Sequence, residues 1–63
     1  MNLARETIHA LQTMGLTDYE TRTYIALNSI ISGTATEISL AANVPRSRIY
    51  QVLKSLNKKG FIE

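Results

Sequence analysis

The chain has 63 residues, with seven Lys and Arg against five Asp and Glu, and a formal net charge of +2. This length makes one domain, residues 1–63, which buries only about 60% of its unfolded surface and so gains only modest stability from its core. The chain has no Cys and one His, His9, which excludes disulfides and a Cys/His zinc site, and no apolar run approaches the ~18 residues that cross a bilayer. We therefore expect a cytoplasmic domain without cofactor, metal, membrane contact or small-molecule site.

The first predicted helix covers residues 2–14. Asn2 can cap it and Gly15 can end it, with Leu16 folding back on the helix. Its apolar side chains form one stripe at helical spacing: Leu3, Ala4, Ile8, Leu11 and Met14. This stripe can pack on the domain's own core or on the same helix of a second copy. We favour a homodimer through residues 3–14, because operators are commonly read by two-fold dimers.

Two T-x-x-E sequences mark the starts of the next two helices. Thr17 with Glu20, and Thr34 with Glu37, have the spacing of a capping box, in which each side chain bonds the other residue's backbone N–H. Gly33 is predicted to end the second helix. The buried stripe of that helix is predicted to contain Thr23, Tyr24, Leu27, Ile30 and Ile31.

Residues 34–58 have the pattern of two helices around a tight turn, which is a helix-turn-helix. Ile38, Ser39 and Ala42 form the inner face of its first helix, and Val44 fills the turn. Asn43 tolerates the left-handed backbone that ends this helix. The second helix, residues 45–58, opens at the proline that follows Val44, since proline loses nothing at a helix start.

The second helix is amphipathic and basic. Its apolar positions are Ile49, Val52, Leu53 and Leu56, and the opposite side is polar. Residues 46–59 hold five cations and no anion, whereas residues 1–45 hold two cations and four anions. A charge run commonly does no more than solvate an exposed helix, but this asymmetry together with the motif favours contact with DNA.

The last residues suggest the start of a wing hairpin that the chain does not complete. Gly60 can end the last helix, and Phe61 can pack on Leu56. Phe61 and Ile62 then begin an extended segment, but three residues cannot form a stable hairpin. We interpret the chain as a fragment, and its fold as all-α: a helix-turn-helix of the winged-helix type with four helices and no complete wing.

Three stretches resemble the N-terminal winged helix-turn-helix domain of TrmB-type archaeal and bacterial transcriptional regulators. They are MGLTDYETRTYIAL (14–27), TEISLAANVPRSRIYQVLKSL (36–56) and KKGFI (58–62). The G-L-T-x-Y-E and V-P-R-S-R-I-Y pieces are fairly specific, whereas L-x-x-x-G-F-I also fits winged helices of the MarR and ArsR types. The resemblance implies a DNA-binding repressor or activator, often dimeric, whose recognition helix matches residues 45–58.

The chain departs from the family pattern at several points. Ser39 replaces the usual Ala, Asn43 replaces the usual Gly, and Leu40 occupies a position that is normally polar. The size of Ser39 and the backbone tolerance of Asn43 make both replacements acceptable. Leu40 is either a single exposed apolar residue or a protein contact, and we prefer the first, plain interpretation. Family members usually carry a separate sugar-sensing domain, which these residues do not contain, so no sugar binding is expected of them.

Groove geometry assigns candidate roles to the polar side chains. The first turns of a recognition helix approach base edges, where Arg can hold guanine and Gln can hold adenine in bidentate fashion. Major-groove candidates are Arg46, Ser47, Tyr50 and Gln51, although Tyr50 could equally lay its ring on Arg46 or on neighbouring apolar surface. Phosphate candidates are Arg48 and Lys54; Lys58 and Lys59 lie further along and contact either the flanking backbone or nothing. Thr34 and Thr36 could also meet a phosphate, but helix capping is the simpler role.

Two other classes of function are considered. A winged-helix module that binds proteins in a transcription or other assembly keeps the same core, but has a neutral or acidic outer face on its last helix. An enzyme lacks support, because the sequence has no Cys, no acid–base pair tied to His9 and no Gly-rich phosphate loop. We therefore predict sequence-specific binding of double-stranded DNA by a transcriptional regulator, with the protein-interaction module as the alternative.

Overall fold

The computed structural model describes residues 3–30 and 33–63, apart from the side chains of residues 3 and 4. Within these ranges the chain forms four helices and no strand: α1 (Leu3–Thr13), α2 (Asp18–Ser29), α3 (Ala35–Ala42) and α4 (Arg46–Lys58). The prediction of an all-α chain with four helices is therefore confirmed. The predicted cap Asn2 and the predicted stripe residue Ile31 lie outside the described residues.

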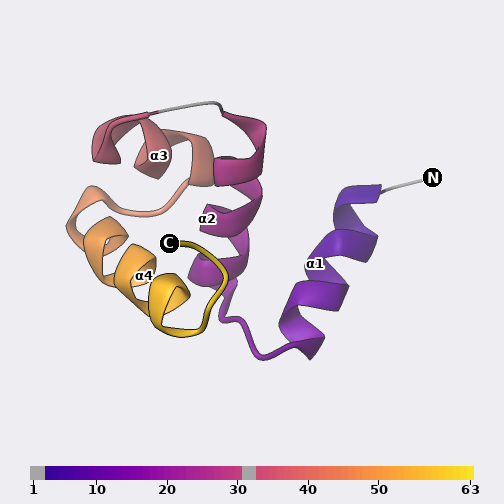
Figure 1. Ribbon diagram of the computed structural model, residues 1–63. Helices are drawn as coiled ribbons and strands as arrows, with labels where there is room; N and C mark the ends of the chain where they lie inside the picture. Colours follow the sequence, from indigo (N-terminus) through magenta and orange to yellow (C-terminus); the bar gives the residue numbers. More distant parts are fainter. Residues whose placement is uncertain (1–2, 31–32) are drawn as a thin grey trace.

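Helices α2, α3 and α4 pack against one another, whereas α1 contacts only α2 among the helices (Figure 1). The core lies between the three mutually packed helices. Ile49 and Leu56 of α4 are fully buried there, against Ala26 of α2 and Ile38 of α3. Each of these side chains removes apolar surface from water, which is the main favourable contribution to folding. The helix-turn-helix thus forms part of the hydrophobic core.

Both capping boxes form as predicted. The Glu20 N–H donates to Thr17 Oγ1 at 3.1 Å, and the Thr17 N–H donates to Glu20 Oε1 at 2.8 Å. The corresponding distances at Thr34 and Glu37 are 3.2 and 2.9 Å. Because each box satisfies two backbone N–H groups that have no intrahelical acceptor, the starts of α2 and α3 are determined locally.

The turn between α3 and α4 also follows the prediction. Asn43 has φ 56° and ψ 46°, the left-handed conformation expected for the residue that ends α3. The Val44 N–H donates to the Ser39 carbonyl at 3.0 Å, and the Val44 side chain is buried. Exposed Leu40 follows the plain interpretation of a surface apolar residue. The reversal therefore depends on one left-handed residue followed by one buried apolar side chain.

Two glycines close their helices in the predicted way. Gly15 and Gly60 have φ of +98° and +85°, and each lets the next residue bond back to the helix. The Leu16 N–H donates to the Leu11 carbonyl at 3.2 Å, and the Phe61 N–H donates to the Leu56 carbonyl at 3.0 Å. Each turn therefore returns an apolar residue to the core.

The ends of the first two helices differ from the prediction. Helix α1 ends one residue before Met14, whose side chain is 64% exposed as the chain turns toward Gly15. Helix α2 ends at Ser29 and not at Gly33, since Ile30 is extended with φ −122° and ψ 144°. The Ser29 hydroxyl donates to the Ile25 carbonyl at 3.0 Å, a back-bond that weakens the last turn of the helix.

Gly33 has a different role from the predicted one. A Cβ atom there would lie 3.1 Å from the Ile30 side chain, so the missing side chain allows Ile30 to turn inward. The core face of α2 also differs from the predicted stripe. Thr23 is fully buried and Tyr24, Leu27 and Ile30 are half-buried, but Ala26 and Glu20 are buried as well.

Phe61 and Ile62 do not begin a strand. Both are half-buried and pack against the core. The Phe61 ring meets the Tyr24 ring edge to face, with centroids 5.6 Å apart and planes at 78°. Aromatic packing and the glycine turn before it therefore hold Phe61 against α2, where the sequence suggested the first strand of a wing.

Candidate nucleic-acid interface

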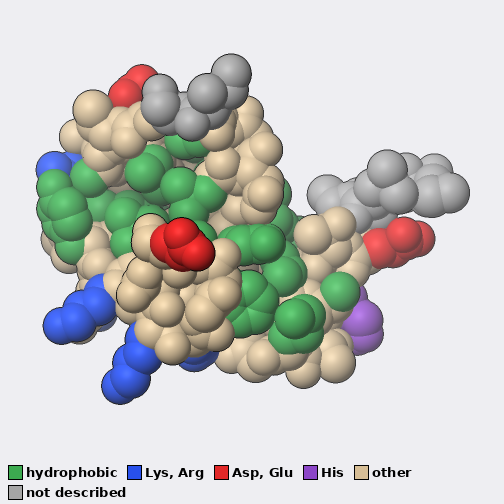
Figure 2. Space-filling view, viewed as in Figure 1, with side chains coloured by type: hydrophobic (Ala, Val, Ile, Leu, Met, Phe, Trp, Pro, Cys, Tyr) green, Lys and Arg blue, Asp and Glu red, His purple; other side chains and the backbone are tan. Residues whose placement is uncertain are grey.

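Helix α4 separates its apolar and polar side chains as the sequence predicts. Ile49, Val52 and Leu56 are buried, and Leu53 is half-buried. The exposed side carries every candidate contact predicted on this helix: Arg46, Ser47, Arg48, Tyr50, Gln51, Lys54 and Lys58. In Figure 2 most of the visible Lys and Arg side chains project at the lower left, where Figure 1 shows α4. The outward side of α4 is therefore a basic surface.

Most side chains of this basic surface are available to a ligand. Within the described ranges, five of them form neither a side-chain hydrogen bond nor an ion pair: Ser47, Arg48, Gln51, Lys54 and Lys58. The first turn of α4 contains no acidic residue, and its N-cap Pro45 forms no side-chain bond. No carboxylate on α4 offsets its cations, so the positive charge faces solvent.

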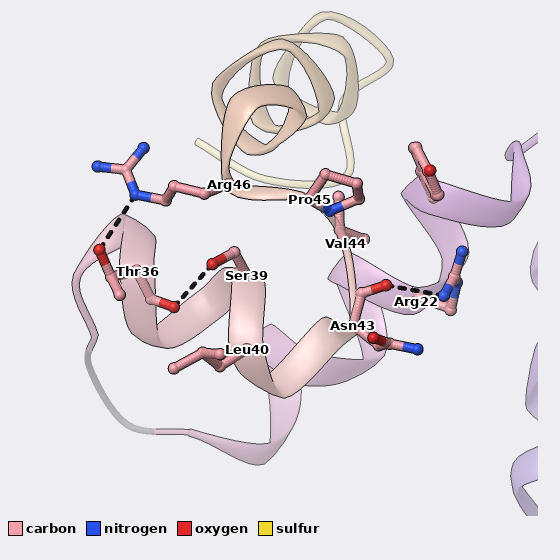
Figure 3. Close-up of a pocket in the computed structure, with 9 residues that line it drawn as sticks. Arg22, Thr36, Ser39, Leu40, Asn43, Val44, Pro45 and Arg46 are labelled. Atoms are coloured by element: carbon pink, nitrogen blue, oxygen red, sulfur yellow. Dashed lines mark hydrogen bonds between the residues drawn. The ribbon is translucent and has the colours of Figure 1, made fainter.

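Arg46 differs from its neighbours because it already has partners. Its Nε donates to Thr36 Oγ1 at 3.1 Å, and its Nη2 donates to the Tyr50 hydroxyl at 3.1 Å. The guanidinium carbon lies 4.8 Å from the centroid of the Tyr50 ring. The sequence left open whether the Tyr50 ring lies on Arg46 or on neighbouring apolar surface, and the structure has the ring against Arg46. Figure 3 shows the Arg46 side chain extending to the start of α3.

The two threonines at the start of α3 have different roles. Thr34 is the N-cap, and its hydroxyl oxygen accepts the Glu37 N–H, which is the capping role given preference in the sequence. Exposed Thr36 is two residues further along, so its hydroxyl oxygen can accept from Arg46. Its carbonyl accepts from the Ser39 hydroxyl at 2.8 Å. Thr36 thus connects α3 to the basic surface of α4.

Lys59 follows the end of α4 and differs from the other cations because it is paired with a carboxylate. Its Nζ lies 2.6 Å from Glu20 Oε1 and donates to the Gly15 carbonyl at 3.1 Å. Burial raises the pKa of Glu20, but hydrogen bonds from Lys59, Ser55 and the Thr17 N–H outweigh burial and hold that pKa at about 2. Lys59 therefore neutralises a buried carboxylate, and the four cations of α4 itself are exposed: Arg46, Arg48, Lys54 and Lys58.

Arg22 of α2 is a contact that the sequence analysis missed. Its Nη1 donates to the Asn43 carbonyl at 2.8 Å, and its Nη2 pairs with Asp18 at the same distance. Arg22 and Arg46 lie on opposite sides of an open hollow of about 540 Å³ between α3 and the start of α4 (Figure 3). The four-residue spacing from Asp18 to Arg22 was visible in the sequence, but the contact with Asn43 depends on how α2 packs on the turn.

Two classes of site find no support in the part of the chain that the structure describes. No group of three or more His, Cys, Asp or Glu side chains could hold a metal ion there. None of the described helices is long and apolar enough to cross a membrane.

The sequence is similar to known regulators. "HTH-type sugar sensing transcriptional regulator TrmBL1" of Pyrococcus furiosus is 39% identical over 61 residues, covering 97% of this chain and 18% of that protein. "DNA-binding HTH-type transcriptional repressor TrmBL2" of Thermococcus kodakarensis is 46% identical over 43 residues, which is 68% of this chain and 16% of that protein. "Uncharacterized protein YrhO" of Bacillus subtilis is 38% identical over 50 residues, covering 79% and 18% respectively. No solved structure gives a significant match.

These relatives are much longer than the chain, which spans less than one fifth of their lengths. The similarity covers nearly all of this chain, including α2, α3 and α4 with their basic surface. The family described as "Sugar-specific transcriptional regulator TrmB" matches residues 11–63. The chain therefore belongs to the TrmB family of transcriptional regulators, which are DNA-binding proteins and not enzymes.

Proposed function

We propose that this chain binds double-stranded DNA sequence-specifically, with α4 as the recognition helix in the major groove. One observation carries the proposal: the outward side of α4 is exposed, basic and free of carboxylates, while its opposite side is buried in the core. A helix in this position can enter a groove without unpacking the domain. The cations would displace counterions from the phosphates, which supplies sequence-independent affinity.

The free side chains of α4 divide into two groups by chemistry. Ser47 and Gln51 are neutral donors and acceptors in the first half of the helix, so they suit base edges. Arg48 and Lys54 suit phosphates, and Lys58, at the end of α4, suits the flanking backbone. The remaining candidates, Arg46, Tyr50 and Thr36, form the edge of this surface that faces α3.

A salt titration tests the proposal. Four exposed cations on α4 should release counterions from about four phosphates, so log K should fall with log salt at a slope near −4. Lys54→Ala should weaken binding to all duplexes alike and make the slope shallower by about 1.

The measurement is fluorescence anisotropy of a labelled duplex at several salt concentrations. A protein-interaction module, the alternative function, would show little duplex affinity at any salt concentration. That result would refute the proposal, because a surface that contacts phosphates must give a duplex affinity that falls as the salt concentration rises. Sequence preference is tested separately by selection from a randomised duplex library.

We also propose a homodimer through residues 3–14. Among the described helices α1 contacts only α2, and in Figure 1 it stands apart from α3 and α4. Beside it lies an open groove lined mainly by small and apolar side chains, among them Ile8, Ile25 and Ala41. A two-fold dimer would bring two α4 helices to half-sites about one helical turn apart. Sedimentation that shows only monomer at micromolar concentrations would refute this arrangement.

A further inference from the structure

We propose that Arg46 and Thr36 together bind one backbone phosphate of the duplex, and that Tyr50 acts as a positioning residue for Arg46. Arg46 then contributes affinity and register, and base discrimination falls to Ser47 and Gln51. The inference rests on the proposed function, DNA binding through α4. It changes the role expected for Arg46 from the sequence, where its place in the first turn of the helix suggested contact with guanine.

The partners of Arg46 hold its side chain at the edge of α4 that faces α3. Nε donates to Thr36 Oγ1 on α3, and Nη2 donates to the Tyr50 hydroxyl, each at 3.1 Å. The Tyr50 ring supports the guanidinium from one side, with 4.8 Å between the guanidinium carbon and the ring centroid. Two hydrogen bonds and one ring contact therefore define the direction of a side chain that is otherwise flexible.

The donors that remain suit a phosphate. Arg46 retains both Nη1 hydrogens and one Nη2 hydrogen, because a guanidinium carries five N–H donors and two are in use. Thr36 accepts through its hydroxyl oxygen, so its own hydroxyl hydrogen is still available to a ligand. Both groups are exposed at the first turn of α3. A phosphate offers several acceptor oxygens to such convergent donors.

The place of α3 distinguishes phosphate from base. When the second helix of a helix-turn-helix lies in the major groove, the helix before it crosses the sugar–phosphate backbone. A guanidinium bonded to the first turn of α3 therefore lies over the backbone, at the edge of the groove. Within the described residues the side chains of Ser47 and Gln51 form no hydrogen bond to α3, and both remain on the outward side of α4.

The test compares Arg46→Ala with Gln51→Ala on two duplexes, a preferred one selected with the wild-type chain and a scrambled one. Arg46→Ala should weaken both duplexes by the same factor and make the salt slope shallower by about 1. Gln51→Ala should leave the slope unchanged and reduce the preference between the two duplexes by about 5- to 150-fold. Both side chains are exposed, so circular dichroism should show native folding in each variant.

Positioning by Tyr50 has its own readout. Tyr50→Phe keeps the ring and removes the hydroxyl that accepts from Arg46, so it should weaken binding in the wild-type background and have no effect in the Arg46→Ala background. Thr36→Val should make the salt slope shallower, and Thr36→Ser, which keeps the hydroxyl, should restore it. A role in folding alone would change neither the slope nor the coupling between Tyr50 and Arg46.

The outcomes separate the two proposals. If the wild-type chain has no salt-dependent affinity for duplexes, the proposed function fails and this inference fails with it. If the wild-type chain binds as expected but Arg46→Ala abolishes the preference for the selected duplex, only the inference fails, because Arg46 then reads a base. If Tyr50→Phe weakens the Arg46→Ala protein as much as the wild type, Tyr50 contacts DNA itself and the positioning role is refuted.

Discussion

Glu20 offers the sharpest test of how this domain is held together. Its carboxylate is 3% exposed, yet it remains ionised because Lys59, Ser55 and the Thr17 N–H all donate to it. Glu20→Gln keeps the shape of the side chain and removes the charge, so it imitates the protonated acid. We expect this substitution to lower the free energy of unfolding by about 2 kcal/mol at neutral pH.

The magnitude follows from the lowered pKa. Lowering the pKa of Glu20 from 4.5 to about 2 corresponds to an upper bound of about 3 kcal/mol between the charged and neutral forms. The side chain of Lys59 is 37% exposed, so water screens part of its attraction and we reduce the value to about 2 kcal/mol. In a chain this short the loss should lower the melting temperature by about 8 to 16 °C.

The assay is urea unfolding followed by circular dichroism, with Glu37→Gln as the matched control. Glu37 occupies the same place in the other capping box but is exposed and has no lysine partner in the described chain. Hydrogen bonding with Thr34 lowers the pKa of Glu37 too, but its carboxylate faces solvent, so the loss in Glu37→Gln should be much smaller. Equal losses in the two variants would refute the reasoning, because the box alone would then explain the role of Glu20.

The pH dependence gives a second check on the same group. Because folding lowers the pKa of Glu20, its contribution is complete above about pH 4.5 and is lost as the pH falls toward about 2. The difference in unfolding free energy between wild type and Glu20→Gln should therefore be constant near neutrality and shrink across that interval. A difference that stays the same at pH 3 and pH 7 would contradict an ionised Glu20 in the folded chain.

Two further substitutions test the turn and the core. Asn43→Gly should leave the free energy of unfolding nearly unchanged. Asn43→Val should lower it by about 1 to 2 kcal/mol in urea unfolding, because a β-branched residue resists the left-handed φ of 56°. Equal stability of the two variants would contradict this reasoning. Ile49→Ala should lower the free energy of unfolding by about 2 to 5 kcal/mol, because the Ile49 side chain is fully buried. Leu40 is 76% exposed, so Leu40→Ala should change that free energy by less than about 0.5 kcal/mol. A large loss at Leu40 in thermal unfolding would mean that it is covered in solution.

Much of the fold was predictable because its signals are local. Each capping box joins residues three positions apart, and the left-handed turn needs one tolerant residue, Asn43. The amphipathic spacing of α4 likewise separated the buried Ile49 and Leu56 from the exposed Gln51 and Lys54. The candidate contacts on α4 were thus found from the sequence as a surface, although their individual roles were not.

What the sequence determined by itself is a helix-turn-helix with a basic outward helix, because capping, helical periodicity and turn chemistry act over a few residues. Only the tertiary structure decided which charges remain free, because the partners are distant along the chain. Lys59 meets Glu20 from 39 positions away, and Arg46 meets Thr36 from ten, since α4 packs beside α2 and α3. No local pattern carries that information: it arises when the core closes and brings the ends of the helices together.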